Sequence, residues 1–357
     1  MIITLLIFIV ILMALILSHE AGHFFSARFF GVKVEEFGFG LPPRAFGWQG
    51  KKTLYSLNYL PFGGFVRIFG EEGEGASEAG SFSGKPAGKR ALILAAGILA
   101  NILLAYFAFT ALAVAGIPEI LTDDEVPGTR VSLVEVAPGS PADKAGFSPG
   151  DKVKKIASEK EEIAPLKISE ITGFISKNLG GSLKFSIERN GESLEKTVSP
   201  RVNPPEGEGP MGVSLGFLAS RKIPFYQAPL EGAFITWQAF KLTVFGFYDI
   251  IVSLFKGEGE RVQVAGPVGM FGLISSARSS GFASLLMFLG ILSVNLAIIN
   301  LLPIPGLDGG RLFFLLIELV KGTRISPRTS NLFHTAGLII LIALMLLVTY
   351  HDIIKLF

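Results

Sequence analysis

The sequence contains no cysteine and only four histidines in its 357 residues. Without cysteine, the protein cannot form disulfides, thiolate zinc sites, iron–sulfur clusters or a thiol nucleophile. Charged residues make up 17% of the chain, whereas about 25% is typical of soluble globular domains. The net charge of +2 is too small to indicate a nucleic-acid partner. Any histidine chemistry must come from His19, His23, His334 or His351.

Several long segments of the sequence are apolar and contain almost no charged residues. A helix of about 20 apolar residues crosses the hydrocarbon core of a membrane. Four such spans are expected, at residues 1–19, 91–118, 279–307 and 331–350. A further apolar stretch, 233–248, contains Lys241 and is expected to form an amphipathic helix on a membrane surface.

Lysine and arginine gather in two connecting segments, one between the first two predicted spans and one between the last two. Short basic loops face the cytoplasm. We therefore expect both termini and residues 119–278 on the extracytoplasmic side. The expected location is a bacterial plasma (inner) membrane.

Residues 119–222 have a different character, because they are charged, rich in glycine and proline, and contain short alternating runs. Ser140-Pro141 is typical of a helix cap followed by a first-turn proline. Arg189-Asn190-Gly191 is a hairpin turn signal. Strands are predicted at 130–136, 182–188 and 193–199, and a helix at 168–177. The segment is thus predicted to be a small α+β module.

The motif His19-Glu20-Ala21-Gly22-His23 closes the first predicted span. On a helix, residues four apart lie on one face, so the two imidazoles can bind one Zn²⁺. Glu20 is placed to take a proton from an attacking water. The alternative is a pair of interfacial histidines beside a glutamate that reaches toward the headgroups.

Catalytic zinc usually takes three protein ligands, so a third one is needed. His351 belongs to the outer end of the fourth predicted span, and His334 lies on the correct side without a supporting motif. Asp308 follows the third predicted span on the same side as His19 and His23. The alternative role for Asp308 is to cap a helix at 311–320.

These motifs together resemble the site-2 protease family of intramembrane zinc metalloproteases, in particular the regulator-of-sigma-E protease type. Asn300–Gly310 reads NLLPIPGLDGG, and 89–101 is similar to the start of that branch's second span. Residues 37–71 resemble its membrane-reentrant β-hairpin. Residues 132–156 resemble the core of a PDZ domain covering most of 128–200. Well-known members carry two PDZ domains, whereas this chain has room for one.

The resemblance implies an α-helical polytopic membrane protein with four transmembrane helices, a cytoplasmic membrane-associated β-hairpin and an inserted extracytoplasmic PDZ-like α+β domain. Residues 1–118 would form the first half of the protease core, with the reentrant loop at 35–70. The PDZ domain and its linker would occupy 119–222. An amphipathic membrane-surface segment would follow at 223–278, and 279–357 would complete the core.

The resemblance also implies roles for individual residues. His19, His23 and Asp308 carry over as Zn²⁺ ligands and Glu20 as general base. Asn295 and Asn300 become candidates for binding the substrate backbone or the oxyanion, unless they only bridge helices. Gly63 and Gly64 would let an extended substrate approach the hairpin, whose alternative role is membrane anchoring alone.

The implied function is hydrolysis of peptide bonds within or near the transmembrane segment of single-span membrane proteins. Anti-sigma-factor-like regulators and remnant signal peptides are candidate substrates in such regulated intramembrane proteolysis. The PDZ domain would bind a peptide or filter substrates by size, and the lipid bilayer would surround the core. The rival hypothesis is a non-catalytic membrane scaffold that presents the PDZ module. A metal transporter is disfavoured, because the outer half of the predicted spans lacks further ionisable ligands.

Overall fold

The computed structural model describes residues 2–71, 73, 75, 77–122, 124, 126, 128–189, 191–205, 207–256, 266–323 and 325–354. The chain divides into two compact units. One combines Met1–Val114 with Pro224–Phe357, and we call it the helical unit. The other, Ala115–Ile223, is called the β-rich unit.

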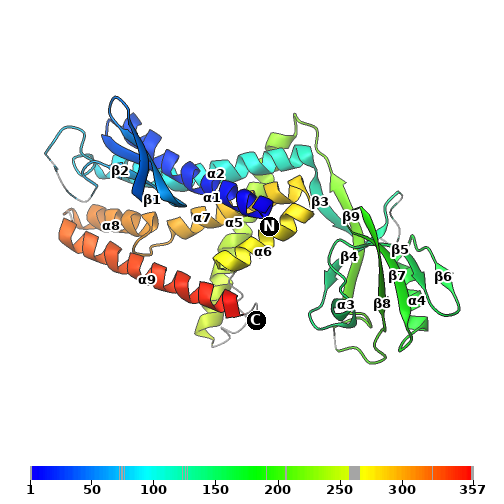
Figure 1. Ribbon diagram of the computed structural model, residues 1–357. Coiled ribbons are helices and arrows are strands. Elements are labelled where there is room, and N and C mark those ends of the chain that lie inside the picture. Colours follow the sequence, from blue (N-terminus) through cyan, green and yellow to red (C-terminus); the bar gives the residue numbers. More distant parts are fainter. Residues whose placement is uncertain are drawn as a thin grey trace. The chain divides into compact units, whose positions relative to one another are not determined.

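Long apolar helices dominate the helical unit. Among the described residues, four helices are long and apolar enough to cross a membrane. They are α1 (Ile2–Phe29), α2 (Ala87–Ala115), α7 (Phe282–Leu301) and most of α9 (Pro327–Ile354). Their side chains are largely exposed, which suits a lipid surrounding. α1, α2 and α7 run close together in Figure 1.

The helix ends differ from the predicted spans for local reasons. α1 continues beyond the predicted end at residue 19, so the histidine motif lies inside the helix. α7 ends at Leu301 rather than at residue 307, because Pro303 and Pro305 cannot continue a helix. A short loop then leads into α8 (Asp308–Lys321), which Gly322 terminates in a left-handed conformation.

Two further helices complete this unit, α5 (Ala228–Phe255) and α6 (Pro267–Ser279). α5 is longer than the helix expected at 233–248. It packs against α7, where the Thr243 hydroxyl donates to the Asn295 amide oxygen at 2.8 Å. It also packs against α2, since a Cβ on Gly232 would lie 2.2 Å from Thr110 Oγ1. Its location at a membrane surface stays a prediction.

The expected hairpin consists of β1 (Val34–Gln49) and β2 (Leu54–Ile68) and lies against α1. Each strand folds back on itself. Residues 34–39 pair with 64–68 on one side and with 54–57 on the other, while 44–49 pair with 54–58. Among the described residues, 64–68 pair with another strand on one side only and therefore form an edge of the sheet. Large exposed apolar side chains cover much of the hairpin: Leu41, Phe46, Trp48, Leu57, Tyr59 and Leu60.

The β-rich unit is built on one sheet with strand order β3-β9-β4-β5-β7-β8, and β6 pairs with β5. The strands are β3 (Ile117–Leu121), β4 (Val131–Val136), β5 (Lys152–Ala157), β6 (Glu162–Ile163), β7 (Leu183–Arg189), β8 (Glu192–Val198) and β9 (Val213–Arg221). The helices are α3 (Pro141–Lys144) and α4 (Ile168–Lys177). Their apolar faces form a core centred on Leu133, Ile156, Ile171 and Phe185.

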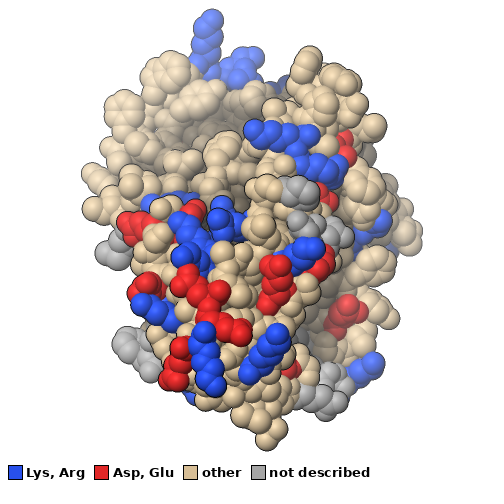
Figure 2. Space-filling view, turned by 90° about the vertical axis from the view of Figure 1, so that its right-hand side faces the viewer, with Lys and Arg blue, Asp and Glu red and all other residues tan. Residues whose placement is uncertain are grey.

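Several local predictions for this unit are confirmed. Ser140 caps α3 by accepting a hydrogen bond from the Asp143 amide at 3.1 Å, and Pro141 is the first helical residue. The predicted helix at 168–177 coincides with α4. β7 and β8 form the predicted hairpin, although Asn190 of its turn lies outside the described residues. Acidic and basic side chains are interspersed on the face seen in Figure 2.

Candidate metal centre

The histidine motif lies in the C-terminal half of α1, where the helix crosses α2. His19 and His23 are one helical turn apart, and their Nε2 atoms lie 3.1 Å from each other. Both residues are buried, with 9% and 7% of their surface exposed. Burying two polar imidazole rings costs free energy unless their nitrogen atoms have polar partners.

The third member of the cluster comes from the other end of the chain. Asp308 Oδ2 lies 2.9 Å from His19 Nε2 and 3.0 Å from His23 Nε2. Asp308 is the first residue of α8, and Leu307 rather than Asp308 occupies the N-cap position. The capping alternative for Asp308 is therefore wrong.

The three ligand atoms fit a zinc ion. They lie within 4.8 Å of one another, and zinc binds histidine nitrogen and carboxylate oxygen at about 2.0–2.2 Å. Atoms about 3 Å apart at the corners of a triangle can all reach one ion at that distance. His19, His23 and Asp308 would hold the ion and leave a fourth position for water or substrate.

Neighbouring groups on α2 orient both imidazoles. His23 Nδ1 lies 2.9 Å from the Ile93 carbonyl oxygen, which can accept its N–H and leave Nε2 free to bind a metal. His19 Nδ1 faces the Asn101 amide at 3.4 Å, and Asn101 Oδ1 is buried without a hydrogen bond from any described residue. Turning that amide so that Oδ1 accepts the His19 Nδ1–H satisfies both groups.

Two glycines let α1 and α2 lie close together beside the candidate metal ligands. A Cβ on Gly22 would lie 2.2 Å from the Ala96 carbonyl oxygen. A Cβ on Gly97 would lie 2.3 Å from His23 Nε2 and 2.9 Å from His19 Cε1. Both positions therefore require glycine, because any side chain would push the helices or the imidazoles apart.

Glu20 lies between the histidines and the hairpin. A cavity of about 210 Å³ is lined by Glu20, the three clustered residues, Arg311 and part of the 64–68 edge. Val66, at the 64–68 edge, and the Glu20 side chain border the same cavity. A Cβ on Gly64 would lie 3.5 Å from Glu20 Cγ and 3.0 Å from Ile16 Cγ2. Glycine at this position therefore lets the sheet edge lie directly beside Glu20.

Charge interactions hold the Asp308 carboxyl ionised. Burial alone would raise its pKa, but hydrogen bonds with His19 and His23 outweigh burial and place the pKa below its usual range. For Arg311 the dominant effect is burial, which lowers the pKa of the guanidinium, while the nearby Glu20 carboxylate opposes that shift.

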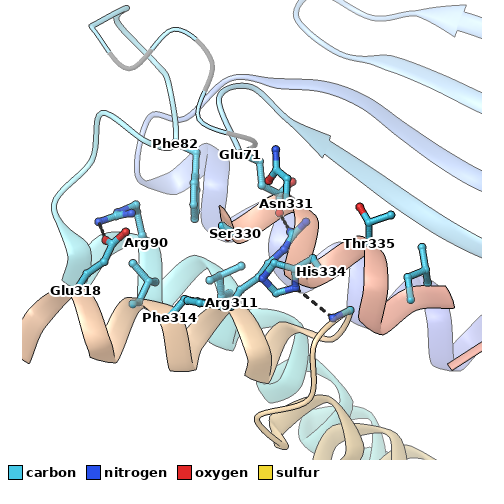
Figure 3. Close-up of a pocket in the computed structure, with 14 residues that line it drawn as sticks. Glu71, Phe82, Arg90, Arg311, Phe314, Glu318, Ser330, Asn331, His334 and Thr335 are labelled. Atoms are coloured by element: carbon cyan, nitrogen blue, oxygen red, sulfur yellow. Dashed lines mark hydrogen bonds and ion pairs between the residues drawn. The ribbon is translucent and has the colours of Figure 1, made fainter. Parts of the chain in front are cut away.

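A second cavity of about 350 Å³ lies next to the metal cluster, and Figure 3 shows the side chains that line it. Arg311 borders both cavities and donates to Glu71 in the segment after β2. His334 Nδ1 accepts a hydrogen bond from the Gly306 amide at 3.1 Å, so it holds the loop before Asp308. Neither His334 nor His351 belongs to the metal cluster found among the described residues.

The other predicted site residues have distinct surroundings. Asn300 is 8% exposed near the end of α7, and its amide makes no hydrogen bond with described residues. Asn295 is engaged by Thr243, which links α7 to α5. Gly63 has φ +112°, and a Cβ there would contact Leu41 at 3.2 Å. The proposed substrate contacts of these residues stay predictions.

Sequence reasoning missed the supporting residues Gly97, Asn101 and Arg311. A signal existed for Asn101, because a lone amide in an apolar helix is unusual and often functional. Gly97 precedes it by four residues and so shares its helix face, as expected for a close helix crossing. Nothing in the local sequence distinguishes Arg311 from the other basic residues near the membrane.

Known proteins place this arrangement in a family. The sequence profile of peptidase family M50 matches residues 7–344. A Clostridium perfringens protein provisionally named a zinc metalloprotease is 33% identical over 343 residues, which are 96% of each chain. The zinc metalloprotease RasP of Oceanobacillus iheyensis is 27% identical over 446 aligned positions, covering 99% of each chain. RasP of Geobacillus kaustophilus is 29% identical and covers 98% of this chain and 97% of its own. The protein therefore belongs to peptidase family M50, the site-2 protease family, and is a zinc-dependent metallopeptidase.

Proposed function

We propose that this peptidase cleaves single-span membrane proteins within or near their transmembrane segments, in a bacterial plasma membrane. The observation that carries the proposal is the position of Glu20, between a three-residue metal cluster and an open sheet edge. Regulators resembling anti-sigma factors and remnant signal peptides are the proposed substrates.

The depth of the cluster supports cleavage at one membrane face. α1 rises about 26 Å from Ile2 to His19, which nearly crosses a hydrocarbon core of about 30 Å. Asp308 follows the end of α7 by one short loop. With the basic loops on the cytoplasmic side, the metal centre lies near the cytoplasmic face, where water can reach it.

The chemistry follows from the donors around the cavity. Zinc in this site supplies a Lewis acid that polarises a peptide carbonyl and makes water a better nucleophile at neutral pH. Glu20 takes one proton from the attacking water as the C–O bond forms. It then delivers that proton to the leaving nitrogen, and the C–N bond breaks to release the amine.

The hairpin edge supports binding of an extended substrate. A membrane helix hides its amides in internal hydrogen bonds, so it must unwind before its peptide bonds can be attacked. Residues 64–68 are paired on one side only and lie beside Glu20. Strand addition there would hold the unwound segment next to the general base. Asn300, and less directly Asn295, would contact the substrate backbone from α7.

For the β-rich unit we propose a PDZ-like peptide-binding role on the extracytoplasmic side. The strand that would accept a peptide is β9, which pairs with β4 along 213–217. β3 already covers its other edge along 217–221. In the described part of the chain, β3 does not pair with residues 213–216, and this short open stretch favours a short chain end as the ligand.

The decisive experiment compares wild-type protein with Glu20→Gln in liposomes that contain a single-span substrate. The substitution keeps the size of the side chain and removes the base, so zinc content should be unchanged while cleavage falls by at least about 100-fold. Asp308→Asn, in contrast, should lose both zinc and cleavage. Equal cleavage by wild type and Glu20→Gln would contradict the proposal. No cleavage of any candidate substrate by wild type would favour the scaffold hypothesis.

A further inference from the structure

A hollow of about 770 Å³ opens where α1 ends, on the hairpin side of the helical unit. Its lining includes Arg28 and Lys33 from the end of α1 and the segment after it. Lys51 and Lys52 from the turn between β1 and β2 complete the lining cations. We call this hollow the basic pocket. Its volume lies in the range of small-ligand sites.

Aromatic rings lie beside two of these cations. The Arg28 guanidinium lies 5.3 Å from the centre of the Phe24 ring, and Lys33 Nζ lies at the same distance from the Phe69 ring. A fifth cation approaches from the segment before α2, since Lys85 Nζ is 3.8 Å from where a side chain on Gly31 would begin. Cations from the end of α1, from the turn between β1 and β2, and from the segment before α2 therefore lie around the basic pocket.

Within the described residues, few carboxylates pair with these cations. In the described part of the chain, the one ion pair of a pocket-lining cation joins Lys33 to Glu35 at 4.0 Å. The nearby Glu36 carboxylate lies 3.6 Å from Arg67 and 3.9 Å from Arg44 instead. Among the described residues that line or approach the pocket, cations outnumber the acids paired with them and repel one another, so an anionic ligand would stabilise the arrangement.

The surroundings are those of a membrane interface. Phe25 and Phe29, in the last turns of α1, are 68% and 83% exposed. A smaller hollow beside the basic pocket is lined by Tyr55, which stacks on the exposed Trp48 at 5.8 Å. Aromatic side chains concentrate at the headgroup level of membranes. In the orientation proposed above, this level belongs to the cytoplasmic leaflet, which carries anionic lipids.

We propose that the basic pocket binds the phosphate-bearing headgroup of an anionic phospholipid. The bound lipid would fix the hairpin turn to the end of α1 and thereby steady the 64–68 edge beside the metal centre. The proposal rests on the proposed membrane orientation but not on proteolysis, so zinc content and cleavage test the enzyme separately from the lipid site.

Trp48 offers a direct reporter, because the chain has only two tryptophans. Full-length Trp237→Phe protein is placed in phosphatidylcholine vesicles that contain brominated phosphatidylglycerol, or brominated phosphatidylcholine for comparison. Bromine quenches a nearby indole, so Trp48 fluorescence measures which lipid occupies the pocket. We expect quenching at lower mole fractions of phosphatidylglycerol than of phosphatidylcholine.

Charge variants then test the pocket itself. The double variant with Lys51→Gln and Lys52→Gln should reduce the preference for phosphatidylglycerol about fivefold per lost charge. The double variant with Lys51→Arg and Lys52→Arg retains both charges and should retain the preference. The matched control is Lys89→Gln with Lys321→Gln, which removes two exposed charges of the same unit outside the pocket and should change nothing. Equal quenching by both lipids, or equal losses in pocket and control variants, would overturn the proposal. Relief of quenching by millimolar inorganic phosphate would assign the pocket to a soluble phosphate and overturn the lipid source.

Discussion

Gly97 provides the sharpest test of the candidate metal centre. Gly97→Ala replaces one hydrogen atom with a methyl group, which would overlap with the His23 imidazole. The Cβ of Gly97→Ala would lie 2.3 Å from His23 Nε2, far inside van der Waals contact. The helices cannot separate to make room without loss, because Gly22 packs α1 against the Ala96 carbonyl at the same crossing. The His23 ring must therefore move.

The expected size of the effect follows from two terms. Forcing a methyl into a packed interior costs about 1–3 kcal/mol of stability, which a protein of this size can survive. Moving the imidazole by about 1 Å takes Nε2 out of the narrow range of zinc–nitrogen distances. Mutations that only disturb a ligand's hydrogen bond already cost about 10–100-fold in affinity. We therefore expect zinc affinity to fall by at least about 100-fold, and cleavage with it.

The assay measures zinc retained by purified protein after dialysis against a graded series of chelator concentrations, together with cleavage of the single-span substrate. Gly88→Ala is the matched control, because Gly88 lies on the same helix and a Cβ there meets nothing within 4 Å. It should keep both zinc and activity. Gly97→Ala protein that retains zinc as tightly as Gly88→Ala would refute the proposed packing of α2 on the ligands.

Asn101→Ala removes the proposed acceptor for the His19 Nδ1–H, so zinc affinity should fall about 10–100-fold in the same dialysis series. Asn101→Asp restores an acceptor and should recover most of that loss; equal losses in both variants would argue against the hydrogen bond. Removing zinc from wild type with a chelator should stop cleavage, and adding zinc back should restore it; cleavage that persists in metal-free protein would count against the site. Asp151→Asn breaks the 2.6 Å ion pair of a fully buried carboxylate with Arg189, at a cost of about 3 kcal/mol. Amide hydrogen exchange in the variant should then be faster than in wild type within 115–223 and unchanged in the β1–β2 hairpin. Equal exchange rates in variant and wild type within 115–223 would show that the ion pair is unimportant.

The cluster of His19, His23 and Asp308 could be predicted because short sequence motifs contain all three residues. His19 and His23 needed only the helical repeat to share a face, and Asp308 needed only the order of the spans to lie on the same side. Their supporting residues depend instead on how two helices cross. Gly97 and Asn101 act through distances between α1 and α2, and no spacing within either helix specifies that crossing.

In the β structure, too, features set by the local sequence could be predicted and features set by distant contacts could not. α4 and the β7–β8 hairpin rest on local patterning and a turn signal, so their positions were predictable. β3 was not predicted, because it is short, mostly exposed and paired with β9 about 100 residues later in the chain. The hairpin was predicted as a single β-loop, yet its strands pair in four segments. That fold-back requires register shifts, which the hydrophobic pattern does not encode.

In the proposed function, the open edge at 64–68 would bind a substrate segment that lipid otherwise protects. Unwinding one turn of a membrane helix exposes amides and carbonyls, each costing several kcal/mol when it has no partner in the hydrocarbon core. A sheet edge offers donors and acceptors at the spacing of an extended chain, and this edge lies beside Glu20. The energy of unwinding is therefore offset where the chemistry occurs. Substrate segments that already contain glycine, proline or polar residues unwind at lower cost, so they should be cleaved faster than uniform leucine helices. Equal cleavage of a leucine-rich span and the same span with a central glycine–proline pair would show that unwinding does not limit the reaction.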